Sequence, residues 1–137
     1  MEEMIFLDTS FLVAVELEKD ENHQKAVRVN REIASGKYGK AYVSDYVFDE
    51  VTTLVLGRTR DLTTAVLAGN YLRQSVNLIK LSENGFDESW QMFKNQKSGK
   101  LSFTDCTILS VLKQNNIDNI ATFDSEFDKI NWINVIK

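Results

Sequence analysis

Four acidic residues stand at positions of this chain where their neighbours are apolar. Asp8 directly follows the apolar run MIFL, and Asp124 follows the apolar segment IATF. Asp105 shares a helical face with aliphatic residues three, four and seven positions further on. Glu50 lies at the margin of the apolar stripe of its own expected helix, whereas Asp49 lies on the opposite, solvated side. Because an ionised carboxylate is costly in apolar surroundings unless it is compensated, each of the four acids needs a reason.

A bound metal ion would be one reason for all four acids together. Carboxylates that share a pocket repel one another, which raises their pKa values and destabilises the fold unless a cation is present. The chain has a single histidine, His23, and a single cysteine, Cys106, so the shared ligands would be oxygen atoms. Oxygen ligands select a hard divalent ion such as Mg²⁺ or Mn²⁺. An ion of this kind binds substrate phosphates and activates a water for attack at phosphorus.

Each acid taken alone also has an ordinary structural interpretation. Asp8 and Asp124 could each cap the helix that follows. The stretch from Ser102 to Asp105 resembles a capping box, with aspartate in place of the preferred glutamate. Glu50 could be a surface glutamate whose aliphatic stem lies along the core. At the level of single residues both interpretations remain open.

The elements that must position these acids alternate between short strands and longer helices. Apolar runs predict strands at residues 4–7, 41–44, 76–81, 117–123 and 133–136. Helical periodicity and capping residues predict helices at residues 10–17, 22–35, 45–57, 61–73, 84–97 and 104–115. This alternation predicts an α/β fold with a parallel sheet of about five short strands, covered by helices on both faces. Ligands of such sheets bind beyond the carboxyl ends of the strands, where Asp8 and Asp124 converge if their strands are neighbours.

Length and composition fit one soluble globular domain over residues 1–137. The chain has 43% hydrophobic and 26% charged residues, and it contains no proline. Its net charge of −4 argues against a broad basic surface but leaves room for a local basic rim. The single cysteine, the absence of a leader and the absence of an apolar run near ~20 residues favour a cytoplasmic protein without a membrane segment. We expect four residues in the core, namely Trp90, Phe93, Cys106 and Trp132.

In these motifs the chain resembles the PIN domain family and, in length and arrangement, the VapC-type toxin ribonucleases. The matching stretches occur in the family's order and span nearly the whole chain; they are IFLDTSFLVAV, VSDYVFDEV, LSFTDCTIL and IATFDSEFDKI. The resemblance implies a Rossmann-like PIN fold with an Mg²⁺ or Mn²⁺ site formed by Asp8, Glu50, Asp105 and Asp124. It also implies cleavage of single-stranded RNA, a homodimer and a small antitoxin protein that covers the site.

The resemblance further implies roles for residues around the four acids. Asp128 corresponds to a position where some relatives carry an additional acid, and we expect it to be a weaker ligand. Small hydroxyl residues match positions that hydrogen-bond the acids in the family; these are Thr9, Ser10, Thr122 and Ser125. Basic residues could line an approach for the phosphate backbone or form an ordinary solvated face; these are Arg58, Arg60, Lys94, Lys97 and Lys100.

Two other enzyme classes place an aspartate at the end of the first strand but fit this chain poorly. A phosphoaspartyl phosphatase of the haloacid-dehalogenase kind needs a second acid two residues later, where this chain has Ser10. A receiver domain needs adjacent acids at the first strand end, which the sequence DTS does not supply. A PIN-like binding or regulatory module without turnover and a housekeeping RNA-processing nuclease remain alternatives to the toxin.

Overall fold

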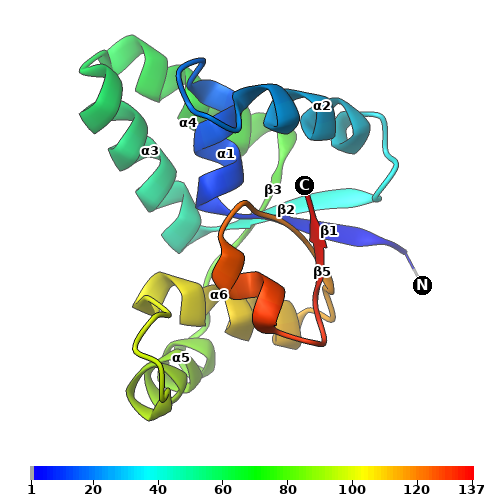
Figure 1. The fold of residues 1–137 in the computed structure, drawn as a ribbon, viewed down its shortest axis with the longest axis vertical. Helices are drawn as coiled ribbons and strands as arrows, with labels where there is room; N and C mark the ends of the chain where they lie inside the picture. Colours follow the sequence, from blue (N-terminus) through cyan, green and yellow to red (C-terminus); the bar gives the residue numbers. More distant parts are fainter. Residues whose placement is uncertain (1) are drawn as a thin grey trace.

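A five-stranded parallel sheet forms the centre of the fold (Figure 1). The computed structural model describes residues 2–137. The strands are β1 (Met4–Leu7), β2 (Lys40–Ser44), β3 (Asn77–Ile79), β4 (Asn119–Ala121) and β5 (Asn134–Ile136), in the spatial order β3-β2-β1-β4-β5. The central strand β1 is fully buried from Ile5 to Leu7, as expected for a parallel strand that is covered on both faces.

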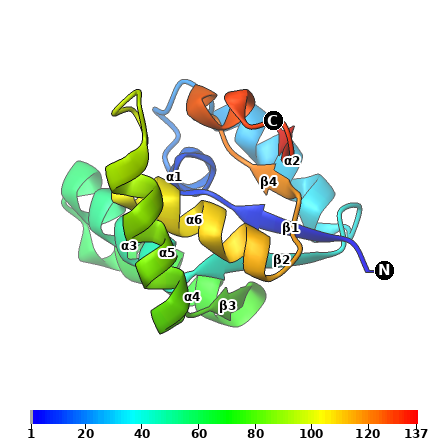
Figure 2. The ribbon, with the colours of Figure 1, turned by 90° about the horizontal axis from the view of Figure 1, so that it is seen from below.

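Six α-helices and one 3-10 helix connect these strands within residues 2–137. They are α1 (Thr9–Glu16), α2 (His23–Ala34), α3 (Asp45–Thr59), α4 (Leu62–Ser75), α5 (Glu83–Asn95), α6 (Phe103–Gln114) and the 3-10 helix η1 (Ser125–Lys129). Figure 1 shows α1, α2 and α4 above the sheet and α5 and α6 below it, and Figure 2 shows α5 and α6 in front of the strands. The predicted α/β architecture with helices on both faces is therefore confirmed.

The strand order places the carboxyl ends of β1 and β4 side by side. The two strands pair in parallel with Leu7 opposite Ala121. The backbone N–H of Asp8 extends this pairing by donating to the carbonyl of Ala121 at 3.0 Å. The chain builds β2 and β3 on one side of β1 and then β4 and β5 on the other. This reversal makes the β1–β4 edge the switch point of the sheet, where ligand sites of α/β folds form.

A continuous hydrophobic core holds the helices on the sheet. It includes Phe6 of β1, Phe11 of α1, Val51 of α3 and Ile108 of α6, all of them at most 1% exposed. Cys106 is also buried, as predicted. Burial of such side chains is the main stabilising contribution in a domain of this size. Within residues 2–137, no helix is both long enough and apolar enough to cross a bilayer.

Two strands begin later than the sequence predicts because the preceding helix still holds their first predicted residues. The apolar run predicts that the fourth strand begins at residue 117. In the structure Asn116 has a left-handed φ of 54°, and the N–H of Ile117 still donates to the carbonyl of Leu112 in α6. The apolar run predicts the third strand over residues 76–81, but Val76 is the C-cap residue of α4 and its N–H donates to the carbonyl of Leu72. Apolar runs continue past the ends of both strands, so hydrophobicity alone misplaces the boundaries.

The prediction that Trp90 and Trp132 lie in the core is wrong, since they are 49% and 40% exposed. Helix α5 packs through small residues, because its buried positions are Gly85 and Ser89. A Cβ atom at position 85 would lie 2.8 Å from the Cδ1 atom of Leu81, so the glycine permits this close packing. Packing through the small residues turns the aromatic face of α5 toward solvent.

Candidate active site

Asp8 lies at the carboxyl end of β1 and is only 4% exposed. Its side chain makes no capping hydrogen bond to α1. Its Oδ2 atom instead accepts hydrogen bonds from the hydroxyls of Thr122 at 2.6 Å and Ser10 at 2.9 Å. The helix-cap interpretation of Asp8 therefore does not apply, and two hydroxyls hold the carboxylate in one orientation.

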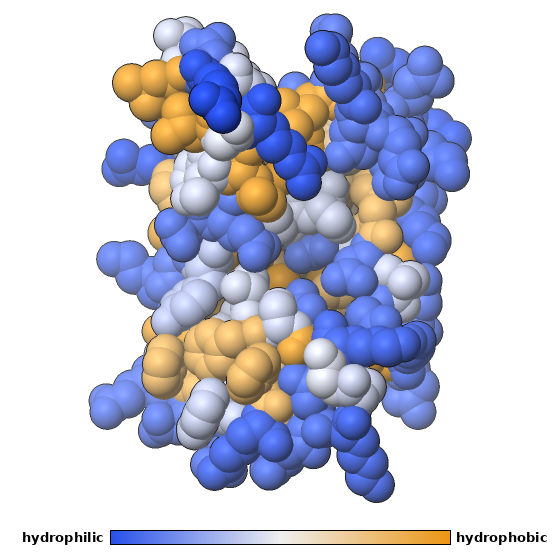
Figure 3. All heavy atoms as spheres, turned by 60° about the vertical axis from the view of Figure 1, so that its left-hand side comes forward, coloured by the Kyte–Doolittle hydropathy of each residue, from blue (hydrophilic) through white to orange (hydrophobic). Residues whose placement is uncertain are grey.

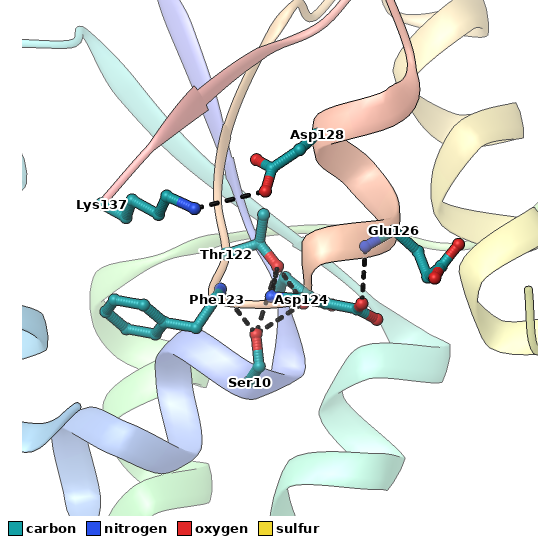
Figure 4. A network of polar contacts seen from close by, with 8 residues as sticks. Ser10, Thr122, Phe123, Asp124, Glu126, Asp128 and Lys137 are labelled. Atoms are coloured by element: carbon teal, nitrogen blue, oxygen red, sulfur yellow. Dashed lines mark hydrogen bonds and ion pairs between the residues drawn. The ribbon is translucent and has the colours of Figure 1, made fainter. Parts of the chain in front are cut away.

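The same two hydroxyls connect α1 to the segment that follows β4 (Figure 4). Ser10 Oγ accepts from the backbone N–H of Phe123 at 3.0 Å, and Thr122 Oγ1 accepts from the backbone N–H of Asp124 at 3.0 Å. The two hydroxyl oxygens lie 3.2 Å apart. Both hydroxyls therefore donate to Asp8 and accept from the backbone of Asp124 or of the residue before it. These bonds fix Asp8 and Asp124 relative to each other.

Asp105 and Asp124 are both helix caps and pocket residues. Asp105 and Ser102 form a complete capping box, in which Ser102 N–H donates to Asp105 Oδ2 at 2.9 Å and Asp105 N–H donates to Ser102 Oγ at 3.0 Å. Asp124 caps η1 by accepting from the N–H of Glu126 at 3.0 Å through Oδ1. Each carboxylate uses one oxygen for its cap, which leaves the other available to a ligand.

A pocket of about 490 Å³ brings all four predicted acids together. Glu50 reaches it from α3 and is half-buried, whereas the neighbouring Asp49 is exposed, as the helical periodicity predicts. Ser44 begins α3 by accepting from the N–H of Val47 at 3.2 Å, which sets this rotation of the helix. The lining residues are Asp8, Thr9, Ser10, Val13, Asp20, Glu21, Asn22, Glu50, Leu54, Arg58, Ser102, Asp105, Phe123 and Asp124.

The charges of these acids affect one another. Burial raises the pKa of Asp8 from 3.8 to about 6, despite the hydrogen bonds from Thr122 and Ser10, and the charge of Asp105 adds to the rise. The pKa of Asp105 is also raised, first by burial and then by the charges of Asp124 and Glu50. A cation in the pocket would favour the ionised forms that burial and mutual repulsion disfavour.

The donor chemistry of the pocket fits a hard divalent ion, because its acidic ligands are carboxylates and it has neither histidine nor cysteine. Within residues 2–137, however, no three acidic, histidine or cysteine side chains lie close enough to hold one ion as they stand. A shared ion therefore requires the acids to move inward from these positions. Hydrogen bonds hold the side chains of Asp8, Asp105 and Asp124 in place. The Glu50 side chain has no hydrogen bond or ion pair within the described residues, so it is the acid with the most freedom to move.

The remaining predicted residues lie in different surroundings. Asp128 does not line the pocket, and its Oδ2 lies 3.3 Å from Lys137 Nζ (Figure 4). Thr9 lines the pocket, but its buried hydroxyl has no hydrogen-bond partner within residues 2–137. Ser125 is exposed. Of the predicted basic residues only Arg58 lines the pocket; Arg60, Lys94, Lys97 and Lys100 are exposed outside it.

Sequence reasoning missed the loop between α1 and α2, which contributes Asp20, Glu21 and Asn22 to the pocket. Asp20 bonds within this loop, since its Oδ1 accepts from the N–H of Asn22 at 2.8 Å. The polar run KDEN was visible in the sequence, but it has no apolar periodicity that would fix its direction. A loop's place over a pocket follows from the packing of its flanking helices, here α1 against α2.

Replacing Ser10 with alanine is expected to lower the free energy of unfolding by about 1–2 kcal/mol, because Phe123 N–H and Asp8 each lose a partner. Urea unfolding measures this change. Ser125→Ala is the matched control, because that exposed hydroxyl makes no such contacts, and its effect should stay within about 0.5 kcal/mol. Equal effects of the two substitutions would contradict a structural role for the Ser10 hydroxyl.

The acid-lined pocket at the switch point of a five-stranded parallel sheet matches a known class of protein. The PIN domain family matches residues 5–133, so this chain belongs to that family, as the sequence motifs indicate. PIN domains are metal-dependent nucleases. The chain is 26% identical over 132 residues to the 23S rRNA-specific endonuclease VapC20 of Mycobacterium tuberculosis, covering 96% of this chain and 98% of the relative.

Solved structures agree with this assignment. The crystal structure of Mycobacterium tuberculosis VapC20, described as a sarcin-ricin loop cleaving toxin, superposes with a TM-score of 0.79 at 27% identity and covers 90% of this chain and 92% of that one. VapBC2 from Rickettsia felis, bound to a DNA fragment from its promoter, has a TM-score of 0.70 at 15% identity over 97% of both chains. The second likeness shows the fold alone.

Proposed function

We propose that this chain is an Mg²⁺- or Mn²⁺-dependent endoribonuclease that cleaves single-stranded RNA, and that it is the toxin of a VapBC-type toxin–antitoxin pair. The observation that carries the proposal is the pocket that acids from four separate segments line at the carboxyl end of a PIN-family sheet. The similarity to VapC20 over nearly the whole length of both chains supports the ribonuclease activity and the toxin role.

In this proposal Asp8, Glu50, Asp105 and Asp124 hold the ion. Asp128 would join them as a weaker ligand only after leaving Lys137, because it lies outside the pocket. When bound, Mg²⁺ or Mn²⁺ supplies a Lewis acid that polarises the phosphate and lowers the pKa of a water. Thr122 and Ser10 keep the Asp8 carboxylate oriented, and the caps of α6 and η1 keep Asp105 and Asp124 at the pocket wall. Arg58, at the last turn of α3, offers positive charge to a phosphate entering the pocket.

The proposed partners are an RNA substrate, a second copy of the chain and a small antitoxin protein, all of them in the cytoplasm. Several solved structures with this fold are toxin–antitoxin complexes, which supports the antitoxin. The rRNA target of VapC20 makes ribosomal RNA a substrate to test alongside unstructured RNA. A housekeeping RNA-processing nuclease shares the same pocket chemistry and differs in lacking a partner that blocks cleavage.

Incubating the purified chain with Mn²⁺ or Mg²⁺ and labelled single-stranded RNA is expected to give internal cleavage that EDTA abolishes. Glu50→Gln should lower the cleavage rate at least about 100-fold, because a neutral amide is a poorer metal ligand and cannot accept a proton. Asp49→Asn is the matched control, since its side chain is exposed one residue away, and it should retain the wild-type rate. Gel analysis of the products measures both rates.

Two results would contradict this proposal. Full cleavage by Glu50→Gln would show that the acid-lined pocket is not the active site. Binding of Mn²⁺ without cleavage of any RNA, while a known active relative works in parallel, would favour a PIN-like binding or regulatory module instead.

A further inference from the structure

Beside the acid-lined pocket, three helices contribute to a group of aromatic side chains that we call the aromatic cluster. Its members are Tyr46 of α3, Phe86, Trp90 and Phe93 of α5, and Phe103 of α6. Phe103 is central, with its ring centroid 6.1 Å from that of Tyr46, 5.3 Å from that of Phe86 and 6.2 Å from that of Phe93. Trp90 stacks on Phe93 at 5.9 Å with an angle of 22° between the ring planes.

Much of the aromatic cluster faces solvent. Phe86 is 46% exposed and Trp90 is 49% exposed. Figure 3 shows an apolar area in the lower half of the molecule, over α5 and the start of α6. A group of exposed rings is unfavourable in water unless a partner covers it, so it marks an interaction surface.

The aromatic cluster and the pocket are built from the same helices. Phe103 is two residues before Asp105 at the start of α6, and Ser102, which precedes Phe103, lines the pocket. Tyr46 is four residues before Glu50, so the two share one face of α3. A polymer whose backbone crosses the pocket therefore needs only a short further stretch of chain to reach the exposed rings.

The charge beside the aromatic cluster identifies the kind of polymer. The segment from Lys94 to Leu101 contains three lysines and no acid, and it leads from α5 to the pocket. Hydrogen bonds in both directions between the Gln96 side chain and the backbone of Leu101, at 2.8 and 3.0 Å, close this loop. The acids of α5 all precede Trp90, so the charge along the helix becomes positive toward the pocket. Exposed rings beside lysines match unpaired bases joined by phosphates.

We propose that the aromatic cluster is a stacking surface for the bases of single-stranded RNA next to the cleaved bond, with Lys94, Lys97 and Lys100 holding the phosphates. This inference rests on the proposed ribonuclease function and gives it a substrate-binding surface. Rings stack on any base, so the surface favours unpaired strands without selecting a sequence. Trp90 is the outermost ring of the cluster by exposure and the one that a base would cover first.

Binding without cleavage tests this surface. Fluorescence anisotropy in EDTA compares a short oligoadenylate with an abasic strand of the same length. Trp90→Leu should weaken binding of the oligoadenylate about five-fold or more and leave binding of the abasic strand unchanged, because stacking needs a base. Lys97→Gln should weaken binding of both strands to a similar extent. Trp132→Leu is the matched control, since that tryptophan is 40% exposed outside the aromatic cluster, and both affinities should stay at wild-type values.

A second readout follows the ring itself. Trp132→Phe leaves Trp90 as the only tryptophan of the chain, and its fluorescence should be quenched by the oligoadenylate but not by the abasic strand. If Trp90→Leu binds both strands as the wild type does, the stacking surface is wrong and the rings serve a protein partner. RNA cleavage by the wild type in Mn²⁺, measured in parallel, distinguishes failure of the stacking surface from failure of the proposed ribonuclease function. If the wild type does not cleave RNA, the proposed function is wrong. If it does, only the stacking surface is wrong.

Discussion

Asp8→Asn is expected to abolish RNA cleavage and, in the absence of metal, to make the protein more stable. The carboxylate is 4% exposed, and burial raises its pKa from 3.8 to about 6. Above pH 6 the folded chain therefore holds a buried negative charge that the unfolded chain exposes to water. The rise in pKa corresponds to about 3 kcal/mol of lost stability at neutral pH, because a tenfold change in proton affinity is worth about 1.4 kcal/mol. A neutral asparagine can still accept from Thr122 and Ser10, so it should regain much of this stability.

The pH dependence gives this prediction a definite sign. Because the pKa of Asp8 is higher in the folded than in the unfolded chain, its unfavourable effect is absent below about pH 4 and complete above about pH 6. The free energy of unfolding of Asp8→Asn minus that of the wild type should therefore increase from about pH 4 to about pH 6 and then stay constant. Urea unfolding in EDTA across this range measures the difference, in which titrating groups that do not interact with Asp8 cancel. Equal stability at pH 7.5 would contradict the prediction.

Binding of Mn²⁺ is expected to weaken about tenfold for each pH unit below about pH 6. The ion needs Asp8 ionised, and burial raises the pKa of this carboxyl to about 6, so protons compete with the metal below that value. The raised pKa of Asp105 adds to the competition in the same direction. Above pH 6 the affinity should change little with pH. Calorimetric titration with Mn²⁺ at pH 7.5 and pH 5 measures the difference.

Two variants define the metal prediction further. Asp8→Asn should bind Mn²⁺ much more weakly at pH 7.5 and lose most of the pH dependence, because it has no proton to release. Asp49→Asn should bind as the wild type does at both pH values, because its exposed side chain lies outside the pocket. An Mn²⁺ affinity that is the same at pH 7.5 and pH 5 in the wild type would place the ion away from Asp8.

The four acids could be predicted from the sequence because each one interrupts a pattern that the fold imposes. A carboxylate that directly follows a buried strand, as Asp8 does, must lie at the carboxyl-end edge of the sheet. The helical period places Glu50 at the margin of the core and the neighbouring Asp49 in solvent. Their convergence follows from the parallel sheet, which alternating strands and helices predict. The structural and the functional interpretations of Asp105 turned out to be compatible, since its capping box lies at the pocket wall.

The surroundings of the acids could not be predicted in the same way. Aromatic residues at helical spacing on α5 resemble a core face, and only the close packing at Gly85 and Ser89 reveals that another face is buried. Which face of an amphipathic helix packs inward depends on the shape of the surface it meets, and one sequence does not describe that surface. The same holds for Asp20, Glu21 and Asn22, whose loop reaches the pocket through the packing of α1 against α2.

The double use of Asp105 affects how this protein can lose its activity by mutation. Its Oδ2 atom caps α6 while the carboxylate also lines the pocket, so a substitution there is expected to weaken the helix start as well as the site. The Asp8 side chain makes no capping hydrogen bond to α1, and removing its charge is expected to strengthen the fold. If cleavage harms the cell, selection for survivors should therefore recover well-folded inactive chains altered at Asp8 or Glu50, and fewer altered at Asp105.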